Sequence, residues 1–313
     1  MNYKHVPVML EEILKYLNPL PGQNFIDCTL GGGGYTTEIA KRIGNGKIIS
    51  IDLDQEAINC VAKKIKEEKI NNIILVRENF KNLKDIIAEY WQGKGDFSGI
   101  VLDLGVSSHQ FDCAERGFSF QHDAPLDMRF GENSLSAEDI VNIWKEKDLE
   151  MIFKNYGEER YAKRIAAEIV RARRTDKIKT TNDLVEAIKK VVPNSYINNK
   201  KIHFATRVFQ GLRIAVNHEL ENLKEVLPQA VNALAPSGKI ATVSFHSLED
   251  RIIKQFFKKE SKDCLCSPEA PACRCGHVAE LKIITKKAIC PEDIEIKDNP
   301  RSRSAKLRVA QKI

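Results

Sequence analysis

The feature that most constrains this 313-residue chain is a regular alternation of short apolar runs with amphipathic segments. The apolar runs are rich in β-branched residues and are bounded by glycine or polar residues, which is typical of buried strands. They span residues 24–27, 47–52, 73–76, 99–103 and 238–245. Residues 8–17 and 206–220 repeat apolar side chains at helical spacing. This alternation predicts an open α/β sheet of parallel strands joined by crossover helices.

The alternation is interrupted between Asp103 and Gly238, an interval too long for one crossover. Residues 139–192 within this interval are helical in pattern and basic in charge. We therefore predict an inserted, basic, helical substrate-binding domain at residues 112–205. Residues 1–111 and 206–313 then form the domain that contains the sheet.

Positive charge is concentrated in one stretch of the chain. The net charge is +6, but residues 160–213 contain 14 Lys or Arg and 4 Asp or Glu, a local balance of +10. The last fifteen residues add five cations and no acid. Such clusters are typical of a polyanion-binding surface, although a solvated helix face has the same pattern. The candidate RNA-binding residues are Arg160, Lys163, Arg164, Arg171, Arg173 and Arg174.

The cysteines and the hydropathy indicate a reducing, cytoplasmic setting. No window approaches the roughly 20 apolar residues of a membrane helix, and the start of the chain lacks a run of signal-peptide length. Four of the eight cysteines cluster in a C-x-C…C-x-C pattern, at Cys264, Cys266, Cys273 and Cys275. Four thiolates can hold structural zinc, with His277 as a substitute ligand, and free surface thiols are the alternative.

A glycine turn follows the first predicted strand, in the segment from Asp27 to Tyr35. Glycines between a strand and a helix let a ligand approach the backbone and the N–H groups at the helix start. Asp52 ends the next strand, where it could accept hydrogen bonds from a ribose. A nicotinamide-binding turn is an alternative, but its G-x-G-x-x-G register places threonine at the third glycine. A tight turn without a ligand is a second alternative.

Asp103 ends another predicted strand and is followed by a run of polar residues. At the carboxyl end of a strand it lies beside the expected ligand crevice, where its oxygens could accept N–H bonds from an amino group. A loop-capping aspartate is the alternative. Further along the chain, Ser247 and Asp250 form an S-x-x-D pattern that predicts a capped helix start.

Taken together, the motifs of this sequence resemble those of the bacterial 16S rRNA cytosine-N4 methyltransferases, the MraW family. The resemblance covers nearly the whole chain. It rests on the blocks at residues 5–12, 27–35, 102–129, 156–159, 203–210, 244–251 and 299–308. Three positions depart from the family pattern, with Tyr35 in place of His and with His109 and Phe204 in place of Pro.

The resemblance implies a class I S-adenosylmethionine-dependent methyltransferase, a Rossmann-like open sheet with an inserted helical domain. It implies N4-methylation of a cytosine in the decoding centre, near the P site of 16S rRNA in the small ribosomal subunit. The carried-over cofactor positions are Gly33, Gly34 and Tyr35 for the methionine portion, Asp52 for the ribose, Phe80 for the adenine, and Asp103 and Gln110 for the remaining edge.

The implied reaction is an in-line methyl transfer, for which the enzyme must align the amino nitrogen, the methyl carbon and the sulfur. Asp103 is the candidate catalytic residue, ahead of Ser107 and Ser108, because its oxygens can receive developing positive charge. The chain has no Pro-Cys dipeptide for C5 methylation, and it lacks the deaminase motif. A nicotinamide oxidoreductase, a noncatalytic RNA-binding assembly factor and a DNA amino methyltransferase remain alternatives. The sequence leaves the oligomeric state open.

Overall fold

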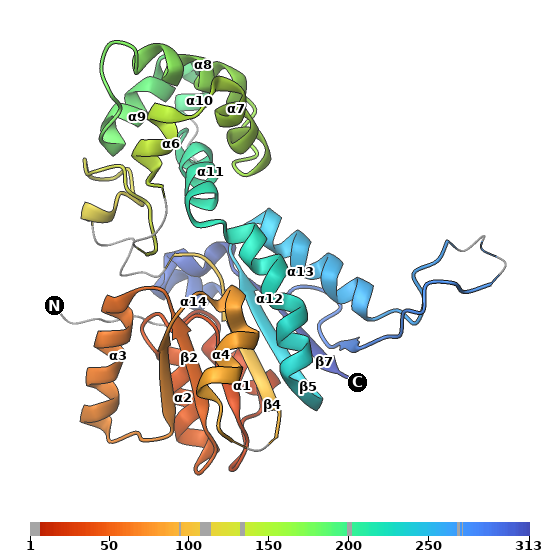
Figure 1. Ribbon diagram of the computed structural model, residues 1–313. Coiled ribbons are helices and arrows are strands. Elements are labelled where there is room, and N and C mark those ends of the chain that lie inside the picture. Colours follow the sequence, from red (N-terminus) through yellow and green to blue (C-terminus); the bar gives the residue numbers. More distant parts are fainter. Residues whose placement is uncertain are drawn as a thin grey trace. The chain divides into compact units, whose positions relative to one another are not determined.

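The computed structural model describes residues 7–93, 95–106, 114–131, 135–198, 202–267, 270 and 272–313 (Figure 1). The chain divides into two compact units. The first consists of Met1–Gly105 and Leu220–Ile313, and the second is Val106–Glu219. This second unit extends beyond both limits of the insertion expected from the sequence, residues 112 and 205. In the part of the chain that the structure describes, no helix is long and apolar enough to cross a membrane.

The first unit is built on a seven-stranded sheet with the order β3-β2-β1-β4-β5-β7-β6. Its strands are β1 (Phe25–Asp27), β2 (Ile48–Asp52), β3 (Ile73–Arg77), β4 (Phe97–Asp103), β5 (Leu234–Ser244), β6 (Leu281–Ile283) and β7 (Lys306–Lys312). The first five pair in parallel, as predicted, whereas β7 is antiparallel to β5 and β6 is antiparallel to β7. The topology confirms the predicted Rossmann-like open sheet and adds two strands that the sequence pattern did not reveal.

Helices cover both faces of this sheet. They are α1 (Leu10–Leu17), α2 (Gly34–Ile43), α3 (Gln55–Glu68), α4 (Leu83–Tyr90), α12 (Glu219–Ala233), α13 (Ser247–Glu260) and α14 (Asp293–Asp298), with 3-10 turns η1 (Phe80–Asn82) and η3 (Pro300–Ser304). Alternate strand residues face opposite sides. Ile26 and Ile49 pack in one core with α4, α12 and α13, while Phe25 and Ile48 pack in the other with α1 and α2. The apolar runs of the sequence are therefore strands that are buried on both faces.

The strand order reverses between β1 and β4. The chain builds β1, β2 and β3 outward in one direction, and β4 then lies on the other side of β1. Crossover connections leave a crevice at such a switch point, outside the carboxyl ends of the strands. Asp27 and Asp103 are the last residues of the two strands that flank it.

Helix α13 is tied to the antiparallel strand β7 by Asp250, which refutes the capping role predicted for that residue. Asp250 accepts from Arg308 Nε at 2.6 Å and from Lys306 Nζ at 3.3 Å. The helix is capped one residue earlier than expected, by His246 with Glu249 in a capping box. Two of the five cations in the last fifteen residues, Lys306 and Arg308, therefore pair with an acid of their own unit.

The second unit is helical, with η2 (Ala114–Arg116), α6 (Ala137–Ile143), α7 (Glu146–Asn155), α8 (Ala162–Ala172), α9 (Thr181–Lys189), α10 (Asn194–Ile197) and α11 (Thr206–Asn217). Its helices enclose one apolar core. Gly157, at the end of α7, lies against α11 so closely that an added Cβ would be 2.3 Å from the carbonyl oxygen of Arg207. The buried Glu159 accepts from the hydroxyl of Tyr196 at 2.5 Å.

Candidate active site

The glycine turn connects β1 to α2 at the carboxyl edge of the sheet. Gly31 and Gly33 adopt left-handed backbone angles, with φ of +48° and +70°, which side chains other than glycine rarely allow. The N–H of Gly31 donates to Asp52 Oδ2 at 2.8 Å, so the turn is attached to the end of β2. The turn is therefore held in shape by the protein's own contacts.

Two of the glycines also permit close packing. A Cβ on Gly33 would lie 2.9 Å from both γ carbons of Val61, and one on Gly34 would lie 2.5 Å from Cγ of Pro7. Helix α2 begins at Gly34 with Gly33 as its N-cap and has no side-chain cap. The first N–H groups of a helix have no intrahelical partners. This end of α2 therefore offers donors to a ligand with a carboxylate.

Asp27 lies beneath the turn and is completely buried. Its carboxylate accepts from the N–H of Thr29 at 3.1 Å and from the hydroxyl of Thr36 at 2.7 Å. The Thr29 hydroxyl in turn accepts from the N–H of Asp103 at 2.7 Å. Burial raises the pKa of Asp27, and these hydrogen bonds oppose the rise. Asp27 thus links the ends of β1 and β4.

Asp52 lies at the end of β2 with both carboxylate oxygens engaged. Oδ2 accepts from Gly31 as described, and Oδ1 accepts from the N–H of Asp54 at 2.9 Å. Burial raises the pKa of Asp52 to about 6, so the carboxylate is mostly ionised at neutral pH. Each oxygen retains a second lone pair. Asp52 can therefore accept hydrogen bonds from a diol while it holds the turn.

Asp103 combines a raised pKa with an unpaired oxygen. Its Oδ1 is buried and has no hydrogen-bond partner among the described residues. Burial raises the pKa of Asp103 to about 8, the charge of Asp27 adds to the rise, and the Tyr35 hydroxyl opposes it. An unsatisfied buried acceptor costs roughly 1–3 kcal/mol. A donor that reached Oδ1 would relieve this cost.

Tyr35 connects the side chain of Asp103 to the backbone at Val8. The Tyr35 hydroxyl lies 2.5 Å from the carbonyl oxygen of Val8 and 3.3 Å from Asp103 Oδ2. The hydroxyl donates to both oxygens, and the contact with the Val8 carbonyl is the shorter of the two. The hydrogen bond from Tyr35 to Asp103 Oδ2 stabilises the carboxylate and so opposes the rise in the pKa of Asp103. Burial and the nearby acids also raise the pKa of Tyr35 well above its usual value.

The structure brings together most of the cofactor residues predicted from the sequence. Gly33, Gly34, Tyr35, Asp52 and Asp103 surround the glycine turn and the adjoining strand ends. Phe80 lies in η1, directly after β3, and is partly buried against the sheet core.

Three predicted residues, Gln110, Ser107 and Ser108, lie outside the described part of the chain. Sequence reasoning also missed two residues of the site, Asp27 as a support and Thr29 as its link to Asp103. Asp27 could have been found, because it ends its strand as Asp52 and Asp103 end theirs.

The candidate RNA-binding residues lie on or beside α8 in the second unit. Lys163, Arg164 and Arg171 are exposed and fall within an arc of about 100° around the helix. Arg173 instead donates to the carbonyl oxygen of Val141 at 2.6 Å, which makes it a structural residue. The two remaining candidates, Arg160 and Arg174, are exposed, and the guanidinium of Arg160 lies over two tyrosine rings.

The Asp103→Asn variant tests the buried acid directly. A folded-state pKa of about 8, well above the usual value of an aspartate, means that the folded protein retains a proton that the unfolded chain loses. Wild-type stability should therefore fall between about pH 4 and pH 8 by up to roughly 1.4 kcal/mol per pH unit from this group. We expect urea unfolding to show that the free energy of unfolding of the variant rises relative to that of the wild type as the pH increases across this window. A constant difference between them from pH 5 to pH 8 would contradict the assignment.

Comparisons with known proteins place this chain in a family. The chain matches the MraW methylase family over residues 2–313. It is 48% identical over 314 residues to the Ribosomal RNA small subunit methyltransferase H of Finegoldia magna, with 100% of both chains covered. It is 49% identical over 316 residues to the protein of the same name from Heliobacterium mobile, again with 100% of both covered.

Among solved structures, an rRNA methylase from Streptococcus thermophilus aligns with a TM-score of 0.45 and 9% identity, covering 99% of each chain. The match along nearly the whole sequence, together with the two relatives, shows that this chain belongs to the MraW methylase family.

Proposed function

We propose that this protein transfers a methyl group from S-adenosylmethionine to N4 of a cytosine in the decoding centre of 16S rRNA, near the P site. The observation that carries the proposal is the buried, unpaired Oδ1 of Asp103 beside the glycine turn at the sheet's switch point. Membership of a methylase family and the names of the relatives support methylation of small-subunit rRNA.

The residues of the first unit fit the proposed cofactor. The N–H groups at the start of α2 suit its carboxylate, and Asp103 Oδ1 suits its ammonium group. Asp52 suits the ribose hydroxyls, and the partly exposed ring of Phe80 suits the adenine. Tyr35 would support the methionine end through its hydrogen bond to Asp103. Gln110 would complete the remaining edge.

When bound, S-adenosylmethionine supplies a methyl group activated by a sulfonium. The contribution of the protein is to hold the amino nitrogen of the cytosine in line with that methyl group and to exclude water. The lone pair of this nitrogen is delocalised into the base, so an acceptor at its N–H favours attack. Asp103 has one unpaired oxygen, and we assign it first to the cofactor. Ser107 and Ser108 follow on the same segment and are candidates for the cytosine amino group.

The second unit is proposed to bind the RNA. Its exposed cations on α8 neutralise phosphates, and the target base must leave its stack to reach the sheet. Membership of a methylase family argues against a nicotinamide oxidoreductase. A noncatalytic assembly factor and a DNA amino methyltransferase are the alternatives that experiment must separate.

The test of function is transfer of labelled methyl from S-adenosylmethionine to purified small ribosomal subunits that lack the modification. We expect the label to be recovered as N4-methylcytidine at one position, and Asp103→Ala to reduce the rate at least about tenfold at subsaturating cofactor. A duplex DNA substrate is the control for nucleic-acid class. Cofactor binding without label on subunits, assembly intermediates or naked RNA would overturn the proposal in favour of an assembly factor.

The RNA-binding role of α8 predicts a specific salt dependence. Replacing Lys163 and Arg164 by alanine should weaken binding to small subunits. It should also make the negative slope of log K against log salt shallower by about one per lost phosphate contact. The matched control replaces Lys147 and Lys154, two exposed lysines of α7, which removes the same charge. If the two double variants weaken binding to small subunits equally, the affinity depends on net charge alone and the role assigned to α8 is contradicted.

A further inference from the structure

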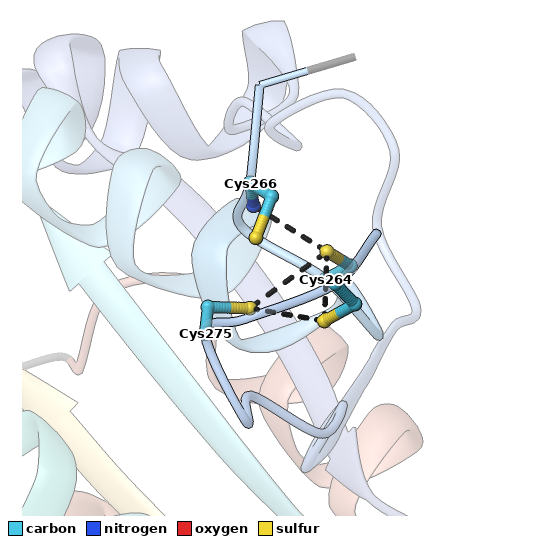
Figure 2. A group of neighbouring side chains, drawn as sticks. Cys264, Cys266 and Cys275 are labelled. Carbon is cyan, nitrogen blue, oxygen red and sulfur yellow. Dashed lines mark hydrogen bonds between the residues drawn. The ribbon is translucent and has the colours of Figure 1, made fainter. Parts of the chain in front are cut away.

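A cluster of four thiols lies outside the site described above. Residues 261–280 connect the end of α13 to β6, and the cluster within this loop consists of Cys264, Cys266, Cys273 and Cys275. Figure 2 shows Cys264, Cys266 and Cys275 gathered together within this loop. All four sulfurs lie within 4.8 Å of one another.

The sulfur positions match a tetrahedral metal site. With zinc–sulfur bonds of about 2.3 Å, tetrahedral geometry puts the sulfurs about 3.8 Å apart. The Sγ atom of Cys264 lies 3.4 Å from that of Cys273 and 3.7 Å from that of Cys275, and Cys273 and Cys275 are 3.6 Å apart. Three of the sulfurs thus lie at nearly the spacing that a single zinc ion requires, and the fourth, that of Cys266, lies within 4.8 Å of them.

Backbone N–H groups point at these sulfurs in a reciprocal pattern. The middle residue of the first C-x-C, Leu265, donates to Cys275 Sγ at 3.3 Å, and the middle residue of the second, Arg274, donates to Cys266 Sγ at 3.4 Å. Cys264 Sγ also accepts from the N–H of Cys266 at 3.4 Å. Hydrogen bonds to sulfur favour the thiolate, the form that binds metal.

The described part of the loop has no apolar core, although hydrogen bonds at its ends, such as that from the N–H of Glu280 to the carbonyl oxygen of Glu260, attach it to α13. None of its described residues, 261–267, 270 and 272–280, is buried, and Val278 and Leu265 are 70% and 39% exposed. Ordering about 20 residues without an apolar core has a large entropic cost. A metal that joins the two C-x-C segments offsets that cost, because its binding free energy becomes folding free energy.

We propose that these four cysteines bind one structural zinc ion. Binding forms four zinc–sulfur bonds and releases up to four thiol protons to solvent, with no change of oxidation state. His277, the substitute ligand considered from the sequence, is used otherwise, since its Nε2 lies 3.1 Å from the carbonyl oxygen of Lys259. The ion would fix the loop between α13 and β6 and take no part in methyl transfer.

The test is the metal content of the whole protein, purified under reducing conditions without chelator. We expect about one zinc per chain by mass spectrometry of the metal, and less than a tenth of that in the Cys273→Ser/Cys275→Ser double variant. The matched control is Cys290→Ser, an exposed cysteine outside the cluster, which should retain full zinc. Zinc-free wild type with reactive thiols or disulfides at these positions, or zinc retained by the double variant, would overturn the proposal.

A second readout works even if the double variant folds poorly. Wild-type protein exchanged into cobalt(II) should show the intense visible absorption of a tetrahedral thiolate site. Chelation should speed tryptic cleavage after Lys262 or Arg274, both exposed, while the far-ultraviolet circular dichroism stays unchanged. An octahedral cobalt spectrum, or cleavage that chelation does not alter, would contradict a structural zinc site.

Discussion

The buried carboxylate of Asp27 is the interaction on which the rest of the site depends. It fixes Thr29 and Thr36 at 3.1 and 2.7 Å, and through Thr29 it sets the backbone of Asp103. Its charge also helps to raise the pKa values of Asp52, Tyr35 and Asp103. Burial is the larger cause of these three shifts, and the charge of Asp27 adds to it, so one acid at a strand end affects both the geometry and the protonation of the crevice. A positively charged ligand is the natural complement to such a group of acids.

The motifs of the second unit are explained by packing rather than by chemistry. Gly157 permits the crossing of α7 and α11, and Arg207 on α11 donates to the carbonyl oxygen of Glu158 at 3.0 Å. Glu159 is buried with Tyr196, so residues 156–159 serve to pack the helices of this unit together. The exposed basic face of α8 is the part of this unit that we propose contacts RNA. This unit thus combines a rigid apolar interior with a charged outer helix.

The sequence predicted the parallel strands well because β-branched runs buried on both faces leave a strong pattern. It did not reveal β7, because Lys306–Lys312 carries three cations and reads as a basic tail until Asp250 pairs with two of them. Of the three aspartates that form the site, the sequence identified two. Asp52 and Asp103 were predicted. Asp27 was passed over although it ends its strand as the other two do, because its threonine partners are identified only in the folded structure. The roles assigned to the cofactor residues remain predictions.

The central claim is that Asp103 Oδ1 receives the cofactor's ammonium group, which requires the acid to lose its proton. Calorimetric titration with S-adenosylhomocysteine at pH 6.5, in two buffers of different ionisation enthalpy, measures that proton directly. With a pKa of about 8 before binding, wild-type Asp103 should release close to one proton that the Asp103→Asn variant does not release. Equal proton release by wild type and variant, with equal affinity, would contradict the account.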